Sequence, residues 1–145
     1  MPTDTDADSR PMVLLDTSAA IALVVEDHED HLAVLEVVRG RRLGLAGHAW
    51  FETYSVLTRL PGGRRRSPAD ALRILAHDFP ASVFLGEREA AQLGPDLDRS
   101  GVAGGAVYDA LVAAAARQHD APLLSGDVRA RRVYESLGVE VVDVR

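Results

Sequence analysis

The chain has 145 residues, which is the length of one ordinary domain and is enough to close a hydrophobic core without disulfides. It contains no cysteine and no lysine, because all 16 basic residues are arginine, and this composition excludes thiol catalysis, zinc ribbons, Schiff-base chemistry and a P-loop. Its hydrophobic fraction of 47% is typical of a globular protein, and its net charge of −6 argues against a purely electrostatic nucleic-acid binder.

Residues 1–11 are polar, contain two prolines and three aspartates, and show no apolar periodicity. We expect them to form a disordered acidic tail before a single domain over 12–145, with Met12 as a candidate start of translation. The apolar run that follows contains Asp16 and is preceded by acidic residues, so it is neither a signal peptide nor a membrane span. We therefore expect a cytoplasmic protein that does not contact a membrane.

Short apolar runs alternate along the chain with stretches of helical spacing or helix-capping signals. In chain order these patterns predict a strand over 12–15, helices over 19–25 and 28–39, a strand over 42–46, a helix over 49–60, a helix from 68, a strand over 82–85, helices over 87–97 and 107–118, a strand over 122–124, a helix over 128–137 and a strand over 139–142. Strands without polar alternation, separated by helices, indicate a parallel sheet that is covered on both faces. The predicted fold class is therefore α/β, with five strands in one domain.

Two aspartates follow predicted strands of this sheet. Asp16 comes directly after the first strand and Asp127 follows the fourth, so a parallel sheet would bring both to the edge where α/β proteins bind ligands. Each is also a favoured N-cap for the helix that follows it. Glu52 and Asp109 lie in predicted helices, where a solvated acid or a carboxylate near the helix N-terminus is an equally ordinary interpretation.

The four acids together indicate more than each does alone. Four clustered carboxylates would repel one another at neutral pH and would oppose folding unless a cation compensated them. Ligands that are all carboxylate oxygens favour a hard metal, Mg²⁺ or Mn²⁺, and such a metal activates water and stabilises a phosphoryl oxygen. The sequence therefore predicts hydrolysis of phosphodiester bonds.

Four stretches of the sequence, in this order, carry a resemblance to a known family: VLLDTSA (13–19), FETYSVLTRLPGG (51–63), GGAVYDALVAAAA (104–116) and LLSGDVRA (123–130). In them the chain resembles the PIN-domain family, and within it the VapC-type toxin ribonucleases of VapBC toxin–antitoxin pairs. The resemblance implies a three-layer α/β/α sandwich around a mainly parallel sheet. It also implies an endoribonuclease that uses Mg²⁺ or Mn²⁺, cuts structured RNA such as tRNA or ribosomal RNA, and is silenced by a cognate VapB-type antitoxin.

The resemblance can be carried over residue by residue. Asp16, Glu52, Asp109 and Asp127 match the family's four catalytic acids, and we expect Asp16, Asp109 and Asp127 to be the metal ligands. Ser125 matches a small hydroxyl residue before the last acid, where threonine is more familiar. No catalytic acid is missing, which argues against an inactive homologue.

Further residues have both a functional and a plain structural interpretation. Thr17 and Ser18 are able to bind the metal's water or a phosphate, or to cap the first helix. Several arginines could hold RNA phosphates or could be ordinary solvated side chains, namely Arg64, Arg65, Arg66 and Arg129.

The predicted early helices carry more apolar side chains than one face of a sheet requires. These residues are Ile21, Leu23, Val24, Leu32, Leu35 and the apolar members of 50–60. We expect them to form a groove for an antitoxin helix, with an antitoxin arginine near the acids, and we expect a homodimer through another helical face.

One alternative function remains open from the sequence, a catalytically inactive PIN-like domain that binds RNA or acts as a scaffold. A haloacid-dehalogenase-type phosphatase and a receiver domain both need a lysine, and a Rossmann dehydrogenase needs a glycine-rich turn after the first strand; the chain has neither. Stabilisation by Mn²⁺ would distinguish an active site from a scaffold.

Overall fold

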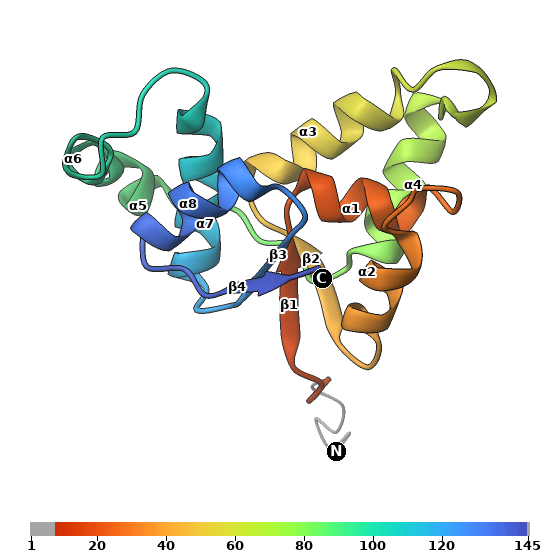
Figure 1. Cartoon of the computed structure of the whole chain (residues 1–145), viewed down its shortest axis with the longest axis horizontal. Coiled ribbons are helices and arrows are strands. Elements are labelled where there is room, and N and C mark those ends of the chain that lie inside the picture. Colours follow the sequence, from red (N-terminus) through yellow and green to blue (C-terminus); the bar gives the residue numbers. More distant parts are fainter. Residues whose placement is uncertain (1–7, 145) are drawn as a thin grey trace, which may run out of the picture.

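The computed structural model describes residues 8–144, and Figure 1 shows helices gathered on both sides of a small central sheet. The elements, in chain order, are β1 (Met12–Leu15), α1 (Thr17–Val24), α2 (His31–Val38), β2 (Arg42–Leu45), α3 (His48–Leu57), a 3₁₀ turn (Gly62–Arg64), α4 (Pro68–Asp78), α5 (Glu87–Ala91), α6 (Leu93–Arg99), α7 (Ala106–Gln118), β3 (Leu123–Ser125), α8 (Val128–Ser136) and β4 (Val141–Asp143).

The sheet has four strands in the order β2-β1-β3-β4, and every pairing is parallel. Its central strands β1 and β3 are almost wholly buried, which explains why β1 is a continuous apolar run and β3 begins with two leucines. Because all four strands run in the same direction, the residues that follow β1 and β3 lie at the same edge of the sheet. The predicted parallel α/β architecture is confirmed.

Alternate residues of β1 serve the two faces of the sheet. Leu14 packs into a cluster that includes the alanines of α7 and Tyr134 of α8. Val13 and Leu15 pack into the opposite cluster, with side chains of α1, α2 and α4. Figure 1 shows this division, with α7 and α8 on one side of the strands and α1, α2 and α4 on the other. The fold is therefore a three-layer α/β/α sandwich, as expected.

The prediction of a strand over 82–85 is wrong, and the sheet has four strands rather than five. Only Val83 pairs, in an isolated bridge with Ala46 beyond the end of β2. The hydroxyl of Ser82 accepts the Leu45 N–H at 2.9 Å, where a regular ladder would offer a backbone carbonyl. The neighbouring carbonyl of Ala81 instead lies over Gly44, so close that a β-carbon there would be 2.2 Å from its oxygen. Because the Ser82 side chain takes the place of a backbone carbonyl, the hydrogen-bond ladder between this segment and β2 is interrupted.

The predicted helix over 87–97 forms as two helices. α5 ends at Ala91 and α6 begins at Leu93, on either side of a single residue, Gln92. The Gly94-Pro95 pair lies in the first turn of α6, where a proline needs no hydrogen-bonded N–H. Most other helix boundaries differ from the predicted ones by no more than three residues.

The predicted disordered tail lies partly outside the described residues, since positions 1–7 are not among them. Within residues 8–11, Asp8 pairs with Arg10, and the carbonyl of Pro11 accepts the backbone N–H of Arg42 at 3.0 Å. Among the helices of residues 8–144, none combines the length and the apolar character needed to cross a membrane.

Candidate active site

Asp16 lies at the C-terminal end of β1, where it is only 3% exposed. Its Oδ1 accepts the Ser18 hydroxyl at 2.6 Å and the Ala19 N–H at 3.1 Å, so it is the N-cap of α1. Its Oδ2 accepts the hydroxyl of Tyr134 at 2.8 Å. Asp16 is thus a helix cap and a buried acceptor at the edge of the sheet.

Asp127 occupies the matching position after β3. Its Oδ1 accepts the N–H groups of Arg129 and Ala130 at 2.9 and 3.1 Å and thereby caps α8. Unlike Asp16, it is exposed to solvent. The capping interpretation of both aspartates is correct, but it does not remove them from the site, because both also line the same pocket.

Two helices bring the other acids to this pocket. Glu52 is an exposed residue on α3, and Asp109 is a half-buried residue in the first turn of α7, which packs beside α3. The pocket has a volume of about 220 Å³ and is lined by Asp16, Thr17, Ser18, Glu52, Asp109, Val112, Asp127 and Tyr134. The structure therefore brings all four predicted acids together from four separate parts of the chain.

Burial raises the pKa of two of the acids, and neighbouring negative charges add to the rise at one of them. The pKa of Asp109 rises from 3.8 to about 6, first because burial disfavours its charged form and then because Asp127, Asp16 and Glu52 repel it. Burial also raises the pKa of Asp16, although hydrogen bonds from Ser125, Ser18, Ala19 and Tyr134 oppose the rise. A cation in the pocket would lower both pKa values, because it would favour the charged forms.

The donor set suits a hard divalent cation, since every ionisable oxygen in the pocket belongs to a carboxylate or to Tyr134. The hydroxyl oxygen of Thr17 is buried without a hydrogen-bond partner among the described residues, at the wall of the same pocket. No three Asp, Glu or His side chains within residues 8–144 are close enough together to hold a metal as they stand. Metal binding would therefore need the other carboxylates of the pocket to turn towards Asp16, which its hydrogen bonds hold in place.

Two of the three predicted supporting residues, Ser18 and Ser125, connect the two capping aspartates, whereas the Thr17 hydroxyl makes no hydrogen bond within the described residues. Ser18 donates to Asp16, and its oxygen accepts the N–H of Gly126 at 3.0 Å, which joins α1 to the loop after β3. Ser125 is buried, and its hydroxyl oxygen accepts the Asp127 N–H at 3.0 Å. These hydrogen bonds fix the loops on which Asp16 and Asp127 are carried.

None of the four arginines predicted to bind RNA lines the acid pocket. Arg64 forms an ion pair with Asp27, and Arg65 and Arg66 donate to backbone carbonyls close to them in the chain. Arg129 follows Asp127 at the start of α8, and its side chain forms no ion pair within the described part of the chain.

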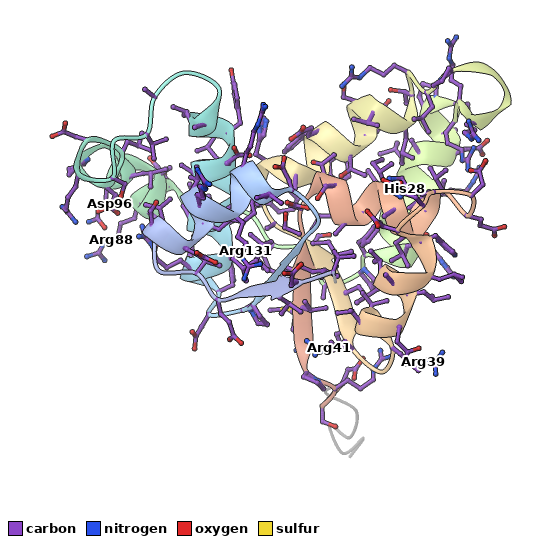
Figure 2. The ribbon with its side chains drawn as sticks, in the orientation of Figure 1. His28, Arg39, Arg41, Arg88, Asp96 and Arg131 are labelled. Carbon is purple, nitrogen blue, oxygen red and sulfur yellow. The ribbon has the colours of Figure 1, made fainter. Side chains whose placement is uncertain are left out.

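Other arginines are placed away from the acids or are already paired. Arg39 and Arg41 lie near the start of β2, at the end of the sheet opposite the acids (Figure 2). Arg131, also labelled in Figure 2, is held by Glu135 and Asp143.

The sequence analysis missed Tyr134. This residue is 1% exposed, lines the pocket and donates directly to Asp16. Tyr134 comes seven residues after Asp127, the N-cap of α8, and this spacing places both on the same side of the helix. The spacing is the sequence signal that could have indicated Tyr134 as a site residue. Burial and the nearby negative charges raise the pKa of Tyr134, so its hydroxyl stays protonated and remains a donor.

Comparison with known proteins agrees with this geometry. A family profile described as PIN domain matches residues 13–136. The chain is 47% identical over 133 residues to Ribonuclease VapC27 of Mycobacterium tuberculosis (strain ATCC 25618 / H37Rv), covering 92% of this chain and 97% of that protein. It is 41% identical over 132 residues to Ribonuclease VapC40 of Mycobacterium tuberculosis (strain CDC 1551 / Oshkosh), covering 90% and 97%.

Solved structures share the fold at lower identity. The structure of FitAcB from Neisseria gonorrhoeae matches with a TM-score of 0.66 and 20% identity, over 92% of this chain and 98% of that one. VapBC2 from Rickettsia felis, bound to a DNA fragment from its promoter, matches with a TM-score of 0.65 and 12% identity, over 91% and 98%.

Proposed function

We propose that this chain, which belongs to the PIN-domain family, is a metal-dependent endoribonuclease that acts as the toxin of a toxin–antitoxin pair. The observation that carries the proposal is the meeting of Asp16, Glu52, Asp109 and Asp127 in one pocket. The similarity to two ribonucleases over nearly the whole chain supports the same activity. We propose structured RNA, such as tRNA or ribosomal RNA, as the substrate and the cytoplasm as the place of action.

Asp16, Asp109 and Asp127 are the residues that would hold Mg²⁺ or Mn²⁺, and the bound ion would supply an activated water and charge stabilisation at the phosphate. Asp16 is held by its hydrogen bonds, so its carboxylate is already oriented before a ligand arrives. The pKa of Asp109, raised to about 6, allows this acid to exchange a proton near neutral pH. Exposed Glu52 borders the pocket from α3, on the side open to solvent.

We propose a small VapB-type antitoxin as the partner. Among the residues of the predicted groove, Leu32 and Leu35 of α2 are 76% and 42% exposed, while Ile21, Leu23 and Val24 of α1 are half-buried. Exposed leucines on one helix suit the apolar side of a partner helix. The structural neighbours include complexes named FitAB and VapBC, which is consistent with a partner of this kind. A homodimer through a different helical face belongs to the same proposal.

The test is cleavage of purified tRNA and ribosomal RNA by the purified protein, in Mg²⁺, in Mn²⁺ and in EDTA. Cleavage should need the metal and should be lost in Asp109→Asn. The matched control is Asp98→Asn, the same chemical change at an exposed position of α6. Cleavage that persists in EDTA, or full activity of Asp109→Asn, would contradict the proposal.

A further inference from the structure

Two aromatic rings stack beside the acid pocket and are not part of its lining. His48 begins α3, and Tyr108 lies in the first turn of α7. Their ring centroids are 5.0 Å apart, with an angle of 23° between the ring planes. This is an offset stack between side chains from two different helices, so the two rings form a fixed unit.

The ring pair lies close to the acids. His48 is four residues before Glu52 on α3, which places the two side chains on the same face one turn apart. Tyr108 directly precedes Asp109 in α7. A chain whose phosphate lies in the acid pocket would therefore have its adjacent base near the rings.

The ring pair is also accessible. Tyr108 is 55% exposed although one of its faces is covered by His48. The segment just before it contains Gly104 and Gly105, and a β-carbon added at either would meet no atom within 4 Å. Gly104 and Gly105 carry no side chains that could cover the ring, and the 55% exposure of Tyr108 leaves ring surface open to a planar ligand.

We propose that the His48–Tyr108 ring pair is a nucleobase-binding subsite, on which a base of single-stranded or looped RNA stacks next to the acid pocket. Every base has a flat aromatic face, and base stacking on aromatic side chains is a common way of holding an unpaired nucleotide. This inference rests on the proposed ribonuclease activity and adds to it the position of the nucleotide beside the reacting phosphate.

The remaining exposed rings offer a matched comparison. Phe84 is 48% exposed, but it packs with Trp50 and Phe51 in a separate aromatic group whose rings are 6.1–6.4 Å from it. This group does not line the acid pocket. Truncation of Phe84 therefore removes a similarly exposed ring without touching the proposed subsite.

The experiment measures binding of a short RNA that contains 2-aminopurine, whose fluorescence is quenched when the base stacks. Asp127→Asn is the parent protein, so that RNA is bound in Mg²⁺ without being cut. Adding Tyr108→Ala should weaken binding roughly 5- to 150-fold, the range expected for one lost base stack, and should abolish the quenching. Tyr108→Trp should retain both, and Phe84→Ala should change neither.

Two further measurements distinguish base stacking from a loss of phosphate contacts and from a general change of the surface. The salt dependence of binding should stay the same in Tyr108→Ala, because the ring contributes no phosphate contact. Equal losses in Tyr108→Ala and Phe84→Ala would overturn the proposal and would indicate a general surface effect, such as an interface between two copies of the chain. Absence of quenching in the parent protein would also overturn it, even if the wild-type protein cleaves RNA, whereas failure of wild-type cleavage would contradict the ribonuclease itself.

Discussion

The hydroxyl of Tyr134 donates a hydrogen bond of 2.8 Å to Oδ2 of Asp16, joining α8 to the end of β1. Both side chains are almost fully buried where they line the acid pocket. Hydrogen bonds to a charged group contribute more to stability than neutral ones. The bond therefore holds an acid of the site and two elements of the core at once.

Tyr134→Phe removes this donor while keeping almost all of the buried ring. We expect a loss of about 1.5–3 kcal/mol in the free energy of unfolding, as for other hydrogen bonds to charged groups. The pKa of Asp16 should rise further, because one bond that favours its charged form is gone. Urea denaturation gives the stability, and Tyr54→Phe is the control, since its hydroxyl makes no hydrogen bond within residues 8–144. Equal stability of the two variants would show that the bond to Asp16 contributes nothing.

Asp109 should make the stability of the metal-free protein depend on pH. Its folded pKa of about 6 lies above the ordinary value of 3.8, so the folded state binds a proton more tightly than the unfolded state. Its stabilising contribution is therefore complete below about pH 4 and is lost as the pH rises through 6. Denaturation in EDTA between pH 4 and 7.5 should show this decrease, and Asp109→Asn should reduce it. An unchanged decrease in the variant would assign it to other groups.

Arg129 and Arg131, two of the three arginines of α8, should differ in their effect on RNA binding. Arg131 is engaged by Glu135 and Asp143, whereas Arg129 has no such partners in the described region. If Arg129 contacts a phosphate, Arg129→Ala should lower the slope of log affinity against log salt by about 0.7–0.9. Arg131→Ala should leave that slope nearly unchanged. Binding isotherms at several salt concentrations would test this. A larger change of the slope in Arg131→Ala than in Arg129→Ala would contradict the prediction.

Gly44→Ala should destabilise the fold. A β-carbon at position 44 would lie 2.2 Å from the carbonyl oxygen of Ala81, which is backbone and cannot turn away without moving the bridge to β2. Overpacking of this kind costs about 1–3 kcal/mol or more. Gly94→Ala is the control, because its new methyl group would meet open space in α6, and a melting experiment compares the two. Similar melting temperatures would mean that the Ala81 segment moves freely.

Much of the fold follows from local pattern. Four consecutive apolar residues bounded by an aspartate predict β1 with its correct limits, Met12–Leu15, because a buried strand and its following N-cap both leave local signals. The segment at 82–85 has three apolar residues after Ser82 but does not pair as a strand. The reason is the Ser82 hydroxyl bonded to Leu45, a contact between residues 37 positions apart that no local pattern reveals.

The same distinction applies to the candidate site. The convergence of Asp16 and Asp127 follows from the topology of a parallel sheet, and the structure places both at one pocket. The pairing of Arg64 with Asp27 depends on two loops meeting in space, so the sequence offered no reason to consider this arginine already engaged. Tyr134 was missed because a tyrosine in an amphipathic helix is usually part of the core, and its bond to Asp16 spans 118 positions.

The four acids differ in how much the stability of the fold depends on them. This difference determines which substitutions can remove the proposed activity while the protein still folds. Asp16 caps α1 and accepts a hydrogen bond from Tyr134, so most substitutions there should destabilise the fold as well as remove a proposed catalytic acid. Glu52 is an exposed side chain of α3. A genetic selection for non-toxic variants that still fold and still bind an antitoxin should therefore recover substitutions of Glu52 far more often than substitutions of Asp16.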